Sequence, residues 1–456
     1  MTVARRLIAV FFLGAWLPIV QANPLVHEFM LENGLKVIVK EDHRAPVVTS
    51  QVWYRIGSSY EEPGATGLSH VLEHMMFKGT ETLGPGEFSR TVAELGGEEN
   101  AFTSRDYTAY FETLSVEHLD KALELEADRM RNLRLDPEEF AKEIQVVKEE
   151  RRLRTDDKPT GLTYEQLMAV AWRASPYQNP VIGWMNDLEN MQLVDLQHWY
   201  ERWYSPNNAT LVVVGNVDPQ DVLTKAKKHF GPIKPSELGQ PKPMREPQQM
   251  GITRVVVRAP AKQPHLMMGY KVPPIGQAER EWEPYALYVL SAVLDGGASA
   301  RLSSELVRKQ KLAASVSAHY DAYSRLQDLF LFDGTPTDNH SLSDLEAALR
   351  AQISQLQKEL ISEKELKRVV TQAVAEKVFQ ADSVFYQAME IGMLESIGLD
   401  HRMLEKEIDR LRAVTAEQVR YVARKYLVDD NLTIATLVPR DEKTAQALAA
   451  EKNNEG

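Results

Sequence analysis

The sequence contains no cysteine. This absence excludes catalysis by a thiol, metal sites built from cysteine thiolates, iron–sulfur clusters and disulfide bonds. It does not fix the cellular compartment, although a chain without cysteine is compatible with an oxidising one.

An excess of positive charge is also missing. The chain has 53 lysine and arginine residues against 65 aspartate and glutamate residues, a formal net charge of -12 at pH 7. A negatively charged surface repels the phosphates of nucleic acids, so we expect no nucleic-acid partner.

Long apolar segments are absent after the first 22 residues, so we expect no stable membrane span in the mature chain. Arg5 and Arg6 precede an apolar run of 14 residues, Leu7–Val20, which is too short to cross a bilayer. The small residue Ala22 follows. This pattern predicts a signal peptide over residues 1–22, cleaved after Ala22, and a secreted, periplasmic protein. An uncleaved N-terminal anchor is the alternative.

The chain has 456 residues, of which 43% are hydrophobic, so it is globular and long enough for two or more domains. Three pairs of segments show weak similarity at nearly the same spacing, which favours an internal duplication. The offsets are 218, 218 and 222 or 223 for the pairs Leu35–Lys40 with Thr253–Arg258, His70–His74 with Tyr288–Ala292, and Trp203–Val212 with Lys425–Ile434.

A proline-rich stretch separates the two similar parts, because proline disfavours both helices and central strands. We therefore expect a first half at residues 23–230, a linker at 231–250, a second half at 251–442 and a polar tail at 443–456. In each half, strands and helices are segregated rather than alternating. This order predicts an α+β fold of two homologous sandwiches, each a mostly antiparallel sheet with helices on one face.

The most informative motif is H-x-x-E-H, formed by His70, Glu73 and His74. On a helix, residues four apart lie on the same face, so the two imidazoles can bind one zinc ion. Glu73 points to nearly the same side. The motif reverses the H-E-x-x-H order of the thermolysin-type zinc peptidases.

A catalytic zinc site needs a third protein ligand and an open position for water, and Glu150 is our candidate for the ligand. It belongs to a predicted helix that starts with Asp136 as N-cap and Pro137 at the first helical position. Glu143 lies seven residues earlier, about two turns, and shares a side with Glu150. Glu143 can therefore hydrogen-bond a ligand histidine while Glu150 binds metal.

Each of these features also has an ordinary explanation. H-x-x-E-H occurs by chance, and the acidic residues around Glu150 could form a solvated helix face. The other nine histidines are scattered and are expected to be structural or exposed.

The segment Gly67–Thr80 resembles the signature of the pitrilysin-type zinc peptidases, also called inverzincins. Glu143-x6-Glu150 matches the downstream acidic motif of that family. A further family pattern follows Gly96-Gly97, at Asn100–Thr103 and Asp106–Thr108. The similarity covers nearly the whole mature chain. At about 430 mature residues, the chain resembles the short branch that contains the mitochondrial processing peptidase β subunit and secreted bacterial homologues.

The resemblance implies peptide-bond hydrolysis with one zinc ion per chain, held by His70, His74 and Glu150. Glu73 would be the general base for the attacking water. The family's substrate-binding edge strand corresponds to Asn100, Ala101, Phe102 and Thr103, which would pair with extended peptides by main-chain hydrogen bonds. An ordinary strand after a Gly-Gly turn is the alternative. In the family, four such halves enclose a chamber, which implies small or unfolded peptide substrates.

The second half carries Tyr288, Ser291 and Ala292 where the first has His70, Glu73 and His74, so it lacks the metal ligands. Family members usually have an arginine and a tyrosine there that help to hold the substrate. Arg301 fits the arginine, but Ala314 occupies the tyrosine position and Tyr320 is out of register.

This departure favours a heterodimer with a homologous chain that lacks zinc but supplies the arginine and the tyrosine. A homodimer is the alternative. The prediction is thus a secreted zinc endopeptidase, with a catalytically silent structural or assembly subunit and a metal-dependent peptide-binding module as competing interpretations.

Overall fold

The computed structural model describes residues 26–239 and 244–440. The predicted signal peptide and polar tail lie outside these residues, and their predictions stay untested. Within the two described ranges, no helix is both long and apolar enough to cross a membrane.

The first half is built on a six-stranded sheet with the strand order β1-β2-β6-β3-β5-β4. The β2–β6 pair is parallel and the other pairs are antiparallel, as predicted for a mostly antiparallel sheet. The strands are β1 (Val26–Met30), β2 (Lys36–Glu41), β3 (Val47–Tyr54), β4 (Glu98–Thr103), β5 (Thr108–Ser115) and β6 (Ala209–Gly215).

The second half repeats this topology with five strands in the order β7-β11-β8-β10-β9, of which only β7 and β11 are parallel. Each strand has a counterpart at the same place in the first sheet, and β1 is the additional one. The two halves therefore share one fold, as the weak internal similarity suggested. The strands are β7 (Thr253–Pro260), β8 (His265–Val272), β9 (Ala313–His319), β10 (Asp328–Pro336) and β11 (Leu432–Arg440).

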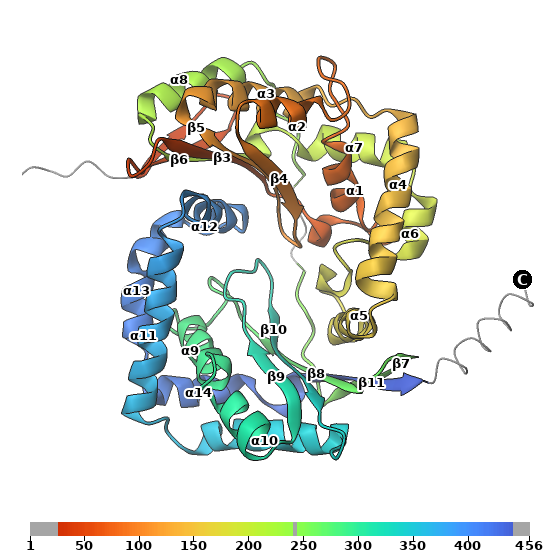
Figure 1. The fold of residues 1–456 in the computed structure, drawn as a ribbon, viewed down its shortest axis with the longest axis vertical. Helices are drawn as coiled ribbons and strands as arrows, with labels where there is room; N and C mark the ends of the chain where they lie inside the picture. The colour runs from red at the N-terminus through yellow and green to blue at the C-terminus, as the bar shows by residue number, and fades with distance from the viewer. Residues whose placement is uncertain (1–25, 240–243, 441–456) are drawn as a thin grey trace, which may run out of the picture.

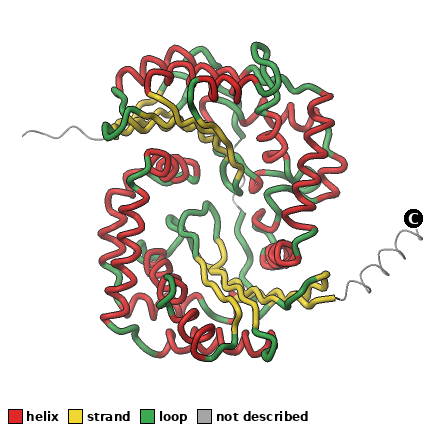
Figure 2. The backbone as a smooth tube through the Cα atoms, in the orientation of Figure 1, coloured by secondary structure: helices red, strands yellow, loops and turns green. Residues whose placement is uncertain are grey.

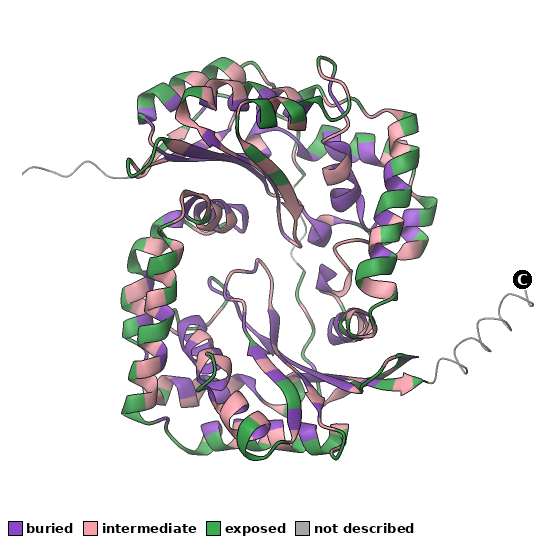
Figure 3. Ribbon diagram, viewed as in Figure 1, coloured by how far each residue is buried: buried purple, intermediate pink, exposed green. Residues whose placement is uncertain are grey.

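Helices of the same half cover one face of each sheet and enclose a separate hydrophobic core in each half (Figures 1 and 3). In the first half the helices are α1 (Leu68–Met75), α2 (Glu87–Glu94), α3 (Leu119–Arg131), α4 (Pro137–Arg151), α5 (Pro159–Ala171), α6 (Met185–Asn190), α7 (Leu193–Trp203) and α8 (Pro219–His229). In the second half they are α9 (Glu283–Asp295), α10 (Leu342–Lys358), α11 (Glu363–Gln380), α12 (Val384–Ser396), α13 (Leu404–Arg412) and α14 (Ala416–Tyr426).

The two halves exchange one helix each, which the sequence did not predict. Helix α5 of the first half packs on β7, β8 and β11, whereas α12 of the second half packs on β3 and β6 (Figures 1 and 2). On α12, Gly392 lies so close to Trp53 that an added Cβ would stand 2.1 Å from its indole nitrogen. Each sheet thus has helices of its own half on one face and a helix of the other half on the opposite face.

The linker is irregular where it is described, and Glu246 fixes it to both halves. This carboxylate accepts backbone N–H groups of Arg173, Ala174 and Ser175 in the first half and pairs with Lys271 of β8 at 2.8 Å. The linker therefore adds specific contacts between the halves.

Candidate metal centre

Helix α1 presents the H-x-x-E-H motif, and its first turn is fixed by a carboxylate outside the helix. Glu61 accepts the backbone N–H groups of Gly67 and Ser69, both at 2.7 Å. Burial raises the pKa of Glu61 to about 7, although these two hydrogen bonds oppose the shift. Gly67 has a φ of 91° and lies against Gly183, so a side chain would fit poorly here.

Helix α4 packs beside α1 and begins as the sequence predicts. The side chain of Asp136 accepts the N–H groups of Glu138 and Glu139. Glu143 and Glu150 both face α1. The carboxylate of Glu143 lies 3.2 Å from Nδ1 of His74 and 2.6 Å from the ammonium of Lys78. A carboxylate at Nδ1 directs the other ring nitrogen, Nε2, toward a metal.

His70, His74 and Glu150 come together as the sequence led us to expect. One oxygen of Glu150 lies 3.4 Å from Nε2 of His74 and 3.7 Å from Nε2 of His70, and the three ligand atoms lie within 4.8 Å of one another. Ligand atoms about 2.1 Å from a tetrahedral zinc ion lie about 3.4 Å apart. This donor set of two imidazoles and one carboxylate therefore fits zinc.

Two further features make His70, His74 and Glu150 suited to bind a cation. Burial, and next the charge of His74, lower the pKa of His70 to about 3, so this imidazole is neutral and able to bind metal at physiological pH. The second oxygen of Glu150 forms an ion pair with the guanidinium of Arg154 at 2.7 Å, and the first oxygen faces the histidines. Arg154 lies in a π-helical turn, Arg152–Asp156, directly after α4.

Glu73 does not belong to the ligand group, because its carboxylate is directed to the edge strand. The hydroxyl of Thr103 donates to it at 2.5 Å. Burial raises the pKa of Glu73, and this hydrogen bond opposes the shift. A carboxylate with a raised pKa beside the metal ligands is suited to carry a proton.

The predicted substrate strand lies at the edge of the first sheet, since β4 pairs only with β5 among the described strands. Asn100 is exposed, and Ala101, Phe102 and Thr103 are partly exposed. Phe102 packs on Trp53 with ring centroids 5.4 Å apart, toward the face covered by α12. The outer edge of β4 is available for pairing with an extended chain.

A cavity of about 460 Å³ lies beside the ligand group and is lined by His70, Glu150, Thr103, Arg105 and Tyr164, among other residues. A larger cavity, of about 1060 Å³, is lined by Tyr60, Trp199 and Arg325 but by none of the three ligands. The chemistry of the donors therefore identifies the smaller cavity as the one that belongs to the site.

The second half contributes no metal ligands on α9. The hydroxyl of Ser291 is bonded to the carbonyl of Tyr288. Arg301 pairs with both oxygens of Glu365 at 2.8 Å, and it is not among the described residues that line the cavity beside the ligands. The structure therefore does not bring Arg301 to the ligands of its own chain.

The same half has Ala314 at the position where the family usually has a tyrosine. Ala314 is exposed on β9, the edge strand that corresponds to β4. Tyr320 is buried, and its hydroxyl donates to the carbonyl of Pro273 at 2.7 Å. Tyr320 is thus not free to replace the missing tyrosine.

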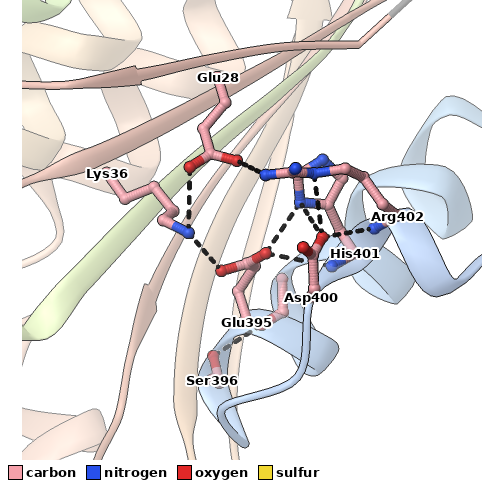
Figure 4. A network of polar contacts seen from close by, with 8 residues as sticks. Glu28, Lys36, Glu395, Ser396, Asp400, His401 and Arg402 are labelled. Carbon is pink, nitrogen blue, oxygen red and sulfur yellow. Dashed lines mark hydrogen bonds and ion pairs between the residues drawn. The ribbon is translucent and has the colours of Figure 1, made fainter.

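A second group of potential ligands, Glu395, Asp400 and His401, also lies within 4.8 Å (Figure 4). Here the ammonium of Lys36 stands 2.9 Å from Glu395, and Arg402 pairs with Asp400. Hydrogen bonds from His401 and Lys36 outweigh the effect of burial and lower the pKa of Glu395 to about 2. The group is satisfied by its own cations, so we interpret it as an ion-pair network that joins the halves.

Sequence reasoning missed three parts of the site. Arg154 follows Glu150 by four residues, a spacing that could have indicated the pair. The contact of Thr103 with Glu73 and the role of Glu61 had no local signal.

Comparisons with known proteins found matching family models, relatives and solved structures. Residues 36–184 match the family described as Insulinase (Peptidase family M16), and residues 190–373 match the Peptidase M16 inactive domain. The zinc protease PqqE of Helicobacter pylori is 37% identical over 377 residues, covering 81% of this chain and 83% of that protein. An uncharacterized zinc protease of Bacillus subtilis, YmxG, is 28% identical over 89% of this chain and 97% of its own length. The crystal structure of a protease from Helicobacter pylori matches with a TM-score of 0.87 and 34% identity, over 91% of this chain and 99% of that one.

Proposed function

The chain belongs to peptidase family M16, the insulinase family, as a zinc protease, and we propose that its zinc ion is held by His70, His74 and Glu150. The observation that carries this proposal is the convergence of these three donors beside Glu73 and the open edge of β4. We further propose one zinc ion per chain, because the only other candidate group in the described residues is neutralised by Lys36 and Arg402.

In the proposed reaction, an extended peptide adds to the edge of β4 and is held by main-chain hydrogen bonds. The zinc ion, when bound, polarises the scissile carbonyl and makes a water molecule more acidic. Glu73 accepts the proton of the attacking water and returns it to the leaving amine. Glu143 and Arg154 hold His74 and Glu150 in their binding orientations, and Thr103 fixes the carboxylate of Glu73.

The test compares the wild type with Glu73→Gln on an unstructured peptide, with zinc content measured in parallel. Glu73→Gln should retain zinc and lose turnover by at least about 10²-fold, because glutamine cannot accept the proton. Near-normal cleavage by this variant would assign the base to another group. A wild type that binds zinc but does not cleave the peptide would favour a peptide-binding module. A wild type that neither binds zinc nor cleaves the peptide would favour a silent structural subunit.

Small or unfolded peptides are the proposed substrates, because the edge of β4 reads main chain rather than side chains and the halves face a closed chamber in the family. A folded protein and its denatured form should then differ strongly as substrates. Equal cleavage of both would contradict the chamber.

Export to the periplasm is a separate proposal, supported by Arg5, Arg6 and the apolar run Leu7–Val20. Sequencing of protein from its native compartment should give Asn23 as the N-terminal residue. An intact Met1 on cytoplasmic protein would contradict export.

The proposed partner is a homologous chain in a heterodimer. Ala314 and the hydrogen-bonded hydroxyl of Tyr320 support this proposal. Loss of one hydrogen-bond donor to a transition state typically costs about 10²–10³ in rate. The purified chain alone should therefore be weakly active, and a zinc-free paralogue that carries the arginine and tyrosine should raise its activity. Full activity of the chain alone, unchanged by a paralogue, would favour the homodimer.

A further inference from the structure

The turn Ser104–Tyr107 joins β4 to β5 and continues directly from Thr103, the residue that contacts Glu73. Its backbone has little freedom. Ser104 donates to the carbonyl of Tyr107 at 2.8 Å, and the N–H groups of Ser58 and Ser59 bond the carbonyls of Ser104 and Arg105. A displacement of this turn would therefore carry Thr103 with it.

Both charged side chains of the turn are held by the second half. The guanidinium of Arg105 donates to both carboxylate oxygens of Asp328, at 3.0 and 2.5 Å, and stacks 4.2 Å from the ring centre of Tyr177. Asp106, which is only 3% exposed, accepts the backbone N–H of Arg325 at 3.0 Å and its Nε at 3.2 Å. The first half supplies the cation of one pair and the anion of the other, and the directional hydrogen bonds of both pairs oppose a relative shift of the halves at this turn.

The turn and the side chain of Arg105 lie beside the ligand group, whereas Arg325 lines the larger neighbouring cavity. Thr103, Ser104, Arg105 and Tyr177 line the same cavity as His70 and Glu150. Asp328 begins β10, and the carboxylate that anchors Arg105 thus comes from the half without metal ligands.

We propose that Asp328 and Arg325 of the second half are positioning residues for peptide hydrolysis in their own chain, because they hold Arg105 and Asp106 and thereby place Thr103 against Glu73. The inference rests on the zinc protease activity proposed above and adds to it a role for the second half. Neither residue touches the reacting atoms.

The first experiment pairs Asp328→Asn with Glu395→Gln as a matched control. Both variants neutralise a largely buried carboxylate of the second half that binds a cation of the first half. Asp328→Asn should lower kcat by about 10-fold to 100-fold, since small displacements of reacting groups have effects of this size. KM should change less than kcat, and zinc content should be unchanged. Glu395→Gln should leave kcat within about 2-fold of the wild type, even if it lowers the melting temperature as much as Asp328→Asn does.

The second experiment asks whether Asp328 acts through Thr103. Thr103→Val removes the hydroxyl but keeps the shape of the side chain. If the effect passes through this hydroxyl, Asp328→Asn should lower kcat by less than about 3-fold in the Thr103→Val background. The inference would be overturned if the loss of kcat in the double variant equalled the product of the losses in the two single variants.

A folded Asp328→Asn variant with the kcat of the wild type would also overturn it, as would equal kcat losses in Asp328→Asn and Glu395→Gln. Should Asp328→Asn not fold, Arg105→Lys carries the same expectations, because lysine keeps the charge but not the bidentate geometry. Cleavage that does not depend on Glu73 would refute the proposed function and this inference with it. Cleavage that depends on Glu73 but not on Asp328 would refute this inference alone, so the two failures are distinguishable.

Discussion

The two halves share a strand order and differ in what their equivalent helices carry. Helix α1 presents His70, Glu73 and His74, whereas α9 presents Tyr288, Ser291 and Ala292 at the corresponding positions. Helix α1 contacts β4 and helix α9 contacts β9, the equivalent edge strand of the second sheet. The fold therefore supports the site without requiring it, and the chemistry depends on a few side chains.

The edge strands show the same contrast. In the first half, Thr103 at the end of β4 contacts Glu73, whereas in the second half β9 exposes Ala314. The second half instead contributes Asp328 and Arg325 to the turn after β4. One copy of the duplicated unit carries the proposed reactive groups, and the other contacts the turn beside them.

The largest expected effect comes from removing a ligand in one half only. His74→Ala should weaken zinc binding by at least about 10-fold and abolish measurable cleavage. Tyr288→Phe, at the position that corresponds to His70, should change neither. Elemental analysis and a peptide assay measure both. A His74→Ala variant with the zinc affinity of the wild type in competition with a chelator would show that the ligands were assigned wrongly.

The next prediction concerns two arginines that are two residues apart. Arg154→Gln should reduce zinc affinity by about 10-fold, because Arg154 holds the second oxygen of Glu150. Arg152→Gln is the matched control, since Arg152 pairs with the exposed Glu149 instead. Competition with a chelator of known affinity gives both values. Equal affinities in the two variants would exclude a role for Arg154 in orienting the ligand.

A smaller effect should follow from disturbing the exchanged helix. Gly392→Ala places a Cβ against the indole of Trp53 and should lower the free energy of unfolding by about 2 kcal/mol. Gly84→Ala is the control, because the nearest atoms to its added Cβ are 3.5 Å away. Denaturant unfolding measures both. A Gly392→Ala variant as stable as the control would mean that α12 can shift on the sheet without cost.

The smallest effect is a pH dependence in the network between the halves. The pKa of Glu395 is lowered to about 2, so its ionised form stabilises the fold above the ordinary glutamate value of 4.5, and this contribution is lost as the pH falls through about 2. The deficit of Glu395→Gln in unfolding free energy, about 1 to 2 kcal/mol, should therefore be larger at pH 6 than at pH 3. A deficit that is independent of pH would exclude ionisation of Glu395 as its source.

The sequence by itself determined the local parts of this protein. The spacing of His70 and His74 places both imidazoles on one helical face, and Asp136 and Pro137 start α4 where they were expected. The repeated pattern of strands and helices gave the α+β class and the duplication. These properties follow from interactions within a few turns of chain, which a sequence displays directly.

Only the tertiary structure decided which distant residues meet. It placed Asp328 on Arg105 across 223 residues of chain, directed Thr103 to Glu73, buried Tyr320 and exchanged α5 and α12 between the sheets. The physical reason is that such contacts depend on how whole layers pack together. Spacing and periodicity along the chain carry no record of that packing.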